Sequence, residues 1–326
     1  MNALKLSSCF VLSGLAAFGQ ANAPTAQISN GAITAKFYLP DATKGYYRGT
    51  RFDWSGQISS LKTAKHEYFG QWNAKYDPRL HDAIMGPVEE FRTNGAGLGY
   101  DEAKPQDTFI RIGVGVVRKP DEKQYEVFKS YDIVDPGKWT VKRGAKQITF
   151  VHDLKDGKGY AYRYTKTVRL VGATNTMVIE HSLKNVGRKL IETSQYNHNF
   201  FVMDGAPTGP DSHVEFPFEL QPVRAFQGGI AESKGKTIGY NSELKPGQSV
   251  IAEFKGFGPT AADYDIKLEN HKAGAGVRIR GDQPLSKVVY WSIRSTFCPE
   301  PYIDLKVAPG REIKWKYTYD FYDIKR

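Results

Sequence analysis

Segments in which apolar and polar residues alternate with a period of two dominate this chain. Over residues 160–170, Tyr160, Tyr162 and Tyr164 share one parity with Val168 and Leu170, and the residues between them are mostly polar. Residues 177–184 alternate in the same way, and a turn-forming stretch at 172–175 separates the two segments. A half-buried strand has this periodicity, so the two segments predict a β-hairpin.

The same pattern recurs along the chain, over residues 28–39, 108–117, 146–151, 214–220, 249–254, 276–280, 287–293 and 313–321. No segment of ten or more residues has a convincing apolar period of 3.6, which an amphipathic helix requires. We therefore expect an all-β fold, most simply one large antiparallel β-sandwich, with two smaller β domains as the alternative. Residues 53–107 show no clear strand, and an irregular region of that length usually lines a site.

Residues 1–23 are predicted to be a signal peptide. Lys5 is their only charged residue, an apolar run covers 10–18, and the small residues Ala21 and Ala23 close the segment. The apolar run is too short to span a bilayer. We expect export to the periplasm or the medium, a mature domain over residues 24–326, and no membrane span.

The cysteine content and the net charge limit the disulfides and the binding partners that can be expected. Cys298 is the only cysteine outside the signal peptide, so no intramolecular disulfide is expected in the mature chain. The whole chain has a formal charge of +10, and its basic and acidic residues are interspersed. A net positive field attracts anions, so an acidic glycan or a charged envelope surface is a possible partner. An exported chain without a recognition motif is not expected to bind nucleic acid.

Two short segments about a hundred residues apart carry an imidazole and a carboxylate. His198 lies in Asn197-His198-Asn199-Phe200-Phe201, after a predicted strand, and Glu300 lies in Cys298-Pro299-Glu300-Pro301, after another. Such a pair can move a proton on and off a neutral substrate. The prolines on both sides of Glu300 restrict its backbone, which suits a positioned base. We expect the two groups to face each other across one cleft, about 5–8 Å apart.

These two segments resemble those of the galactose-mutarotase-like (aldose 1-epimerase) superfamily. Its members carry an Asn-His-x-Tyr/Phe-Phe segment with the general acid and a Cys-x-Glu-Pro segment with the general base. The closing stretch, 307–310 followed by 314–319, also resembles the Pro-Gly turn and final strand of that superfamily. The resemblance implies a supersandwich fold and no metal or cofactor. It also implies that His198 protonates the ring oxygen of a sugar while Glu300 takes the proton of the anomeric hydroxyl.

The N-terminal half departs from this superfamily pattern. Members usually carry a sugar-binding arginine and, further along, a second histidine. Arg51 suits the first role, but no histidine lies between His81 and His152, so we expect the second histidine to be missing.

Several polar residues are predicted to bind the substrate. Arg51, Glu90 and Arg92 are expected to line the cleft, because the planar guanidinium group suits hydroxyls or a carboxylate; a structural set of ion pairs is the alternative. Asn197 and Asp204 are further predicted substrate contacts, with a simple turn as the alternative for Asp204.

Other features are weaker. The glycines of 95–99 lack the strand and helix of a phosphate-binding loop. His66 and His81 have no partners at metal-ligand spacing, so no metal site is predicted. Trp54 and Trp72 lie in the long region 53–107, where an indole can stack on a sugar.

The sequence thus favours an exported mutarotase-type isomerase that acts on a small or oligomeric carbohydrate. Two alternatives stay open. One is a polysaccharide lyase or glycosidase of the same fold that uses Arg51 and Arg92 on an acidic glycan. The other is a carbohydrate-binding module without turnover, in which His198 and Glu300 only hydrogen-bond to hydroxyls.

Overall fold

The computed structural model describes residues 23–325, so the predicted signal peptide lies outside the described residues except for Ala23. The described chain consists of antiparallel strands, two short 3₁₀ turns, η1 (Met203–Gly205) and η2 (Ala261–Asp263), and connecting loops. No α-helix occurs between residues 23 and 325. The all-β prediction is confirmed.

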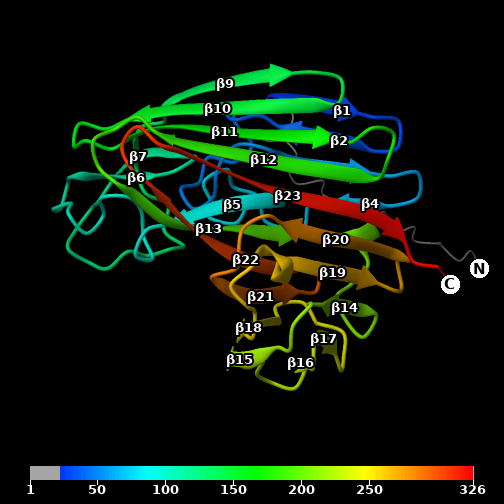
Figure 1. Cartoon of the computed structure of the whole chain (residues 1–326). Coiled ribbons are helices and arrows are strands. Elements are labelled where there is room, and N and C mark those ends of the chain that lie inside the picture. The colour runs from blue at the N-terminus through cyan, green and yellow to red at the C-terminus, as the bar shows by residue number, and fades with distance from the viewer. Residues whose placement is uncertain (1–22, 326) are drawn as a thin grey trace, which may run out of the picture.

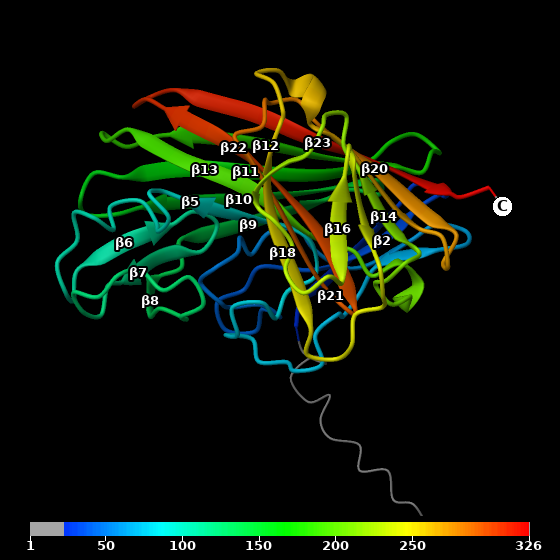
Figure 2. The same cartoon turned by 90° about the horizontal axis from the view of Figure 1, so that it is seen from below.

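Two large sheets form the sandwich, and they lie as two layers in Figure 1 and Figure 2. The ten-stranded sheet has the order β16 (Ala231–Lys234), β17 (Thr237–Tyr240), β14 (Ser212–Glu215), β19 (Asp265–Asn270), β20 (Ala275–Gly281), β23 (Glu312–Asp323), β12 (Thr176–Asn185), β11 (Ala161–Leu170), β10 (Gln147–Lys155) and β9 (Lys138–Arg143). The six-stranded sheet has the order β15 (Gln221–Arg224), β18 (Ser249–Lys255), β21 (Lys287–Ile293), β22 (Thr296–Val307), β13 (Ile191–Phe200) and β5 (Gly86–Arg92). The predicted hairpin is confirmed, since β11 and β12 pair antiparallel.

Two small sheets complete the fold. One contains β1 (Thr25–Ser29), β2 (Thr34–Tyr38), β3 (Gln57–Lys62) and β4 (Glu67–Phe69), and the other contains β6 (Thr108–Arg111), β7 (Gly115–Arg118) and β8 (Ile133–Asp135). The segments 28–39 and 108–117, each expected to be one strand, instead span the turns of the hairpins β1–β2 and β6–β7.

The region 53–107 is less irregular than expected, because it contains β3, β4 and β5. Strand β5 is buried on both faces over Gly86–Phe91, which removes the alternation that would have revealed it. The loops of region 53–107 nevertheless reach the site described below.

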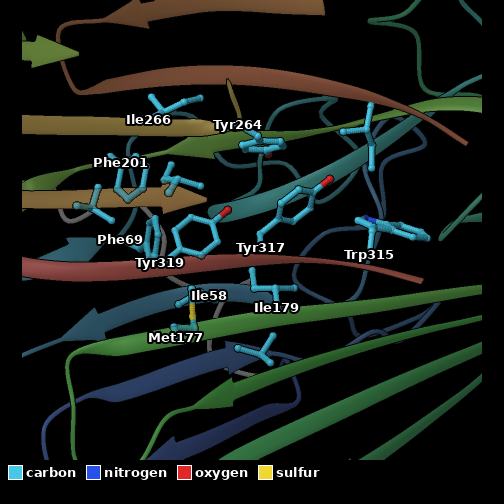
Figure 3. Packing of buried hydrophobic residues seen from close by; sticks show 14 of the residues in the cluster. Ile58, Phe69, Met177, Ile179, Phe201, Tyr264, Ile266, Trp315, Tyr317 and Tyr319 are labelled. Atoms are coloured by element: carbon cyan, nitrogen blue, oxygen red, sulfur yellow. The ribbon is translucent and has the colours of Figure 1, made fainter. Parts of the chain in front are cut away.

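The main core fills the space between the two large sheets. Met177 and Ile179 of β12 and Tyr317 and Tyr319 of β23 are fully buried there, and Figure 3 shows them together with Phe201, the residue that follows β13. Fully burying an aliphatic or aromatic side chain typically contributes about 1.5–3 kcal/mol. This packing fixes the position of β13 and β22, the two strands that carry the predicted acid and base.

Candidate active site

Strand β13 presents different chemistry on its two faces. On the inner face, toward the ten-stranded sheet, Tyr317 Oη of β23 donates to Gln195 Oε1, and Tyr319 Oη donates to Asn199 Oδ1 at 2.8 Å. Successive side chains of a strand point to opposite faces. Tyr196, His198 and Phe200 therefore lie on the outer face of the six-stranded sheet.

The register between β13 and β22 brings His198 to Glu300. The ladder pairs Tyr196 with Tyr302, and the same offset recurs at the bridge between Phe201 and Phe297, so His198 lies directly opposite Glu300. Directly opposed side chains in a sheet are close enough to interact.

The prolines on both sides of Glu300 interrupt the ladder between β13 and β22. Pro299 and Pro301 have no backbone N–H to donate, and β13 and β22 form no ladder pair between Tyr302 and the bridge at Phe297, although β22 stays paired with β21 there. Asn199 replaces part of the lost bonding, because its Nδ2 donates to the carbonyl oxygen of Pro299 at 2.9 Å. The prolines thus hold Glu300 at an opening between two otherwise paired strands.

His198 and Glu300 are in direct contact. His198 Nε2 lies 3.1 Å from Glu300 Oε1, closer than the sugar-wide gap that the sequence predicted. The two residues are only 4% and 6% exposed. His198 Nδ1 is buried without a hydrogen-bond partner among the described residues.

Burial shifts both groups toward their neutral forms. It holds the pKa of His198 well below its ordinary value, and the charge of Arg51 adds to this effect. Burial also raises the pKa of Glu300 to about 7, although Arg51 acts to lower it. Near neutral pH the pair therefore takes up or releases one proton, and the 3.1 Å contact allows that proton to lie on either group.

The pair lies in a cavity of about 410 Å³, a size typical of small-molecule sites. Its walls come from the outer faces of β5, β13, β18, β21 and β22 and from loops of the N-terminal half. The lining residues are Arg51, Trp72, His81, Asp82, Arg92, Val127, Phe128, Tyr196, His198, Phe200, Ile251, Lys287, Val289, Trp291, Glu300 and Tyr302.

The buried carboxylate of Glu90 holds the arginine side chains on the cationic side of this cavity. Its carboxylate accepts from Arg51 Nε at 2.9 Å, from Arg92 Nε at 2.8 Å and from Arg111 Nη2 at 3.0 Å, and it also accepts from the hydroxyl of Tyr196. Although burial opposes ionisation, the three arginines hold the pKa of Glu90 well below its usual range. Arg51 and Arg92 line the cavity, whereas Glu90 is fully buried. The three residues are thus both an ion-pair set and, through the two arginines, part of the cavity wall.

Two predicted substrate contacts lie elsewhere. Asn197 is fully buried on the inner face, where its Nδ2 donates to Glu89 Oε1 at 3.3 Å, because an odd-numbered position of β13 cannot point outward with His198. Asp204 lies in η1 with φ 58° and accepts from the backbone N–H of Glu67 at 2.7 Å. Asp204 also contacts His66 Nδ1 at 2.7 Å, so it stabilises a turn and does not reach the cavity.

A histidine that was not predicted as a site residue lies in the cavity. His81 lines the cavity from the loop between β4 and β5, and its Nε2 lies 3.4 Å from Asp82. From the sequence, His81 was considered only as a metal ligand. Its position in the long region 53–107 was the available signal.

Aromatic rings stack behind the acid–base pair. Phe200 lies parallel to His198 at 3.9 Å between ring centroids, and Trp72 lies parallel to Phe200 at 4.6 Å. Trp291, which the sequence analysis did not single out, also lines the cavity. Trp54 does not, because it is fully buried and its Nε1 donates to Gly49 O at 2.8 Å.

Within residues 23–325, no cluster of three or more His, Cys, Asp or Glu side chains is arranged to hold a metal ion. No helix in this part of the chain is long and apolar enough to cross a membrane.

Several solved structures have a fold similar to that of this chain. The sequence matches no protein-family model, and no curated protein matches it either. The aldose epimerase homologue from C. elegans superposes with a TM-score of 0.57 at 12% identity, over 93% of this chain and 100% of that one. Galactose mutarotase-like proteins from Clostridium acetobutylicum and Lactobacillus casei give TM-scores of 0.55 and 0.52. Their identities are 12% and 14%, over 92% of this chain and 95% and 100% of theirs.

At these identities the likeness concerns the fold alone. The chain has the galactose mutarotase-like β-sandwich fold, as the sequence analysis predicted.

Proposed function

We propose that this protein is an aldose 1-epimerase-type isomerase, which interconverts the α and β anomers of a sugar. The observation that carries the proposal is the contact between His198 and Glu300, at 3.1 Å in a cavity whose wall also holds two arginines. The fold of the aldose epimerase homologue and of the mutarotase-like proteins supports the same conclusion.

The proposed reaction needs two proton transfers. In the ring-opening step His198 Nε2 gives a proton to the ring oxygen, and the C1–O5 bond breaks. Glu300 takes the proton of the anomeric hydroxyl, and the electron pair left on O1 forms the aldehyde. Rotation about C1–C2 and ring closure reverse both transfers, which gives the other anomer. A bound sugar enters between the two side chains, and after ring closure His198 again holds its proton and Glu300 is again ionised.

The cavity can hold a sugar by complementary groups. Arg51 and Arg92 present guanidinium donors already oriented by Glu90, and His81 and Lys287 add polar groups on the cavity wall. Preoriented donors lose less freedom when a ligand binds. Trp72 and Trp291 offer aromatic surface to the apolar face of the sugar ring.

One proton on the pair is the active state in this proposal. One group must donate while the other accepts, so a doubly protonated pair and a fully deprotonated pair are both inactive. The low pKa of His198 and the pKa of Glu300, about 7, bound the range in which the pair holds one proton.

An acidic-glycan lyase that uses Tyr196 as its base finds less support. A lyase needs a tyrosine or histidine base close to an arginine, and Tyr196 accepts from Arg51 Nη2 at 3.1 Å. However, the Tyr196 hydroxyl donates to Glu90, and burial raises its pKa well above the ordinary value. A phenol held in this way is a poor base near neutral pH.

Anomer exchange measured by NMR or polarimetry on a panel of aldoses and uronates tests the proposal. We expect acceleration over the uncatalysed rate for at least one sugar. Binding without acceleration on every sugar would instead establish a carbohydrate-binding module. We also propose export, which rests on residues 1–23 and is checked by the N-terminal sequence of the protein recovered from the periplasm or medium.

A further inference from the structure

A second cavity adjoins the candidate active site on the outer face of the six-stranded sheet. Its volume is about 650 Å³, larger than the 410 Å³ of the first cavity. Trp72 and Trp291 line both cavities. The other lining residues belong to the second cavity alone and include Asn73, Gln248, Ser249, Ile293, Arg294 and Ser295.

The strand registers show that the two cavities are consecutive positions along one surface. Ile251 of β18 pairs with Trp291 of β21, and both line the first cavity. The next pair on the same face, Ser249 with Ile293, lines the second cavity. Two residues along a strand correspond to about 7 Å. A ligand that extends along these strands from the first cavity therefore enters the second.

The shared wall is firmly held. Trp72 donates its Nε1–H to the carbonyl oxygen of Ile84 at 2.8 Å, and its own carbonyl oxygen accepts from Ser295 Oγ at 2.8 Å. The indoles of Trp72 and Trp291 meet edge to face, with ring centroids 5.8 Å apart. Two fixed aromatic rings at the junction suit a ligand that carries sugar rings on both sides of it.

The second cavity has the chemistry of a neutral, hydroxyl-rich ligand. Its polar side chains are amides and hydroxyls, those of Asn73, Gln248, Ser249 and Ser295. Its only charged lining residue, Arg294, is already ion-paired with Glu243. An anionic extension would leave its charge unmatched there, whereas amides and hydroxyls can exchange hydrogen bonds with sugar hydroxyls.

We propose that the second cavity holds the following units of an oligosaccharide whose reducing-end sugar occupies the His198–Glu300 cavity. The inference rests on the proposed function and names its substrate class: a reducing oligosaccharide. The anomeric carbon enters toward His198 and Glu300, which are almost completely buried. The linkage to the next sugar then leaves past Trp72 and Trp291.

The test compares sugars of different length on the full-length mature protein. The probes are D-glucose with cellotriose and maltotriose, and D-galactose with galactotriose, so that each trisaccharide has the matching monosaccharide at its reducing end. The value of kcat/KM for anomer exchange is measured by NMR exchange spectroscopy. We expect about tenfold higher kcat/KM for at least one trisaccharide than for its monosaccharide, because contacts remote from the reacting carbon add binding energy.

Three variants test whether the second cavity causes the higher kcat/KM of the trisaccharides. Ser249→Trp fills the second cavity from an exposed position at the start of β18, and it should lower the trisaccharide value to that of the monosaccharide without changing the latter. Gln248→Ala, a milder change, should lower only the trisaccharide value. Lys255→Trp places the same bulk at the exposed far end of β18, outside both linings, and should behave as the wild type.

The outcomes separate this inference from the proposed function. Equal kcat/KM for monosaccharides and trisaccharides, or a trisaccharide advantage that survives both Ser249→Trp and Gln248→Ala, would overturn the inference while leaving the isomerase intact. If no sugar is isomerised, the proposed function fails. Tryptophan-fluorescence titration with the same probes then tests the extended site through binding alone. Tighter trisaccharide binding that Ser249→Trp removes would then support the extended site, and equal dissociation constants would reject it.

Discussion

Glu89 and Glu90 are neighbours on β5, and both are fully buried, but they face opposite sides of the six-stranded sheet. On the inner face Glu89 contacts Lys166 Nζ and, at 2.8 Å, His181 Nε2, and all three side chains are completely buried. On the outer face Glu90 contacts Arg51 and Arg92, whose side chains are 12% and 23% exposed. One carboxylate is sealed inside the sandwich, and the other anchors the wall of a cavity.

This difference separates structural charges from functional ones. A closed network such as that of Glu89 has its partners inside the protein, and any ligand would first have to open the sandwich. Removing one member of a buried ion pair leaves the other charge uncompensated. Arg51 and Arg92, in contrast, can turn donors toward a ligand while Glu90 keeps them in place. Burial of a charged group alone therefore does not identify a site; its access to a cavity does.

The largest effect is expected on the outer face, at the acid–base pair. His198→Asn or Glu300→Gln preserves approximate size and removes proton transfer, so each should lower kcat for anomer exchange about 10²–10⁴-fold. The double variant should lose less than the product of the two factors, because both residues act in one reaction. Full activity in Glu300→Gln would eliminate the proposed base.

Stability provides the control for Glu300→Gln. The pKa of Glu300 is raised from 4.5 to about 7 in the folded protein, so the stability that this group contributes is lost as the pH rises toward and through 7. Removing the charge should therefore leave the free energy of unfolding at pH 8 unchanged or raise it by up to about 3 kcal/mol. A strongly destabilised variant would mean that its loss of activity reflects unfolding.

The inner face should show the opposite behaviour. Glu89→Gln should lower the free energy of unfolding by about 3 kcal/mol in urea titrations, because Lys166 loses its main counter-charge. This loss of free energy should lie near the lower end of the range that is typical when a buried ion pair is broken. Asp53, whose pKa burial raises to about 7, is near enough to Lys166 to ionise in compensation. The kcat of the folded fraction should remain close to wild type, and a loss above tenfold would break the distinction between the two faces.

Glu90→Gln should be intermediate and act on binding. Arg51 and Arg92 can turn toward water when Glu90 loses its charge. The buried Arg111 keeps its hydrogen bonds to the carbonyl oxygens of Thr50, Ala96 and Arg51, so the loss of stability should be smaller than for Glu89→Gln. KM should rise about tenfold or more, because the guanidinium donors are no longer preoriented. Equal effects of the two substitutions on KM would show that the outer network has no special role.

The smallest effect is expected at Asp204, which lies outside the cavity. Asp204→Asn keeps an acceptor for the Glu67 N–H, and asparagine tolerates the left-handed backbone at φ 58°. The lost contact with His66 is partly exposed, so the stability change should stay below about 1 kcal/mol. Activity should not change; a clear rise in KM would restore Asp204 as a substrate contact.

Much of the architecture could be predicted from local patterns. The alternation over 160–170 and 177–184 identified β11 and β12, because one face of each packs on the core and the other does not. The same logic failed for β5, since its two faces carry Glu89 and Glu90 and both are buried.

The site was predicted in part. The segments of His198 and Glu300 could be identified, and the register of β13 and β22 brings them together. Their direct contact depends on long-range pairing, which no local pattern records. Asn197 was assigned to the cavity because it adjoins His198 in sequence, although strand geometry sends neighbours to opposite faces. His81 and Trp291 come from a loop and a distant strand, so only the assembled fold brings them to the cavity.

The pH dependence of anomer exchange tests the central claim most directly, namely that His198 and Glu300 act as one couple that must hold one proton. In the wild type kcat/KM should fall about tenfold per pH unit as the pH rises beyond about 7, where Glu300 loses its proton. The residual activity of Glu300→Gln should lack this decline. A wild-type kcat/KM that instead rises through pH 7 would show that the deprotonated couple is the active form, and would contradict the account.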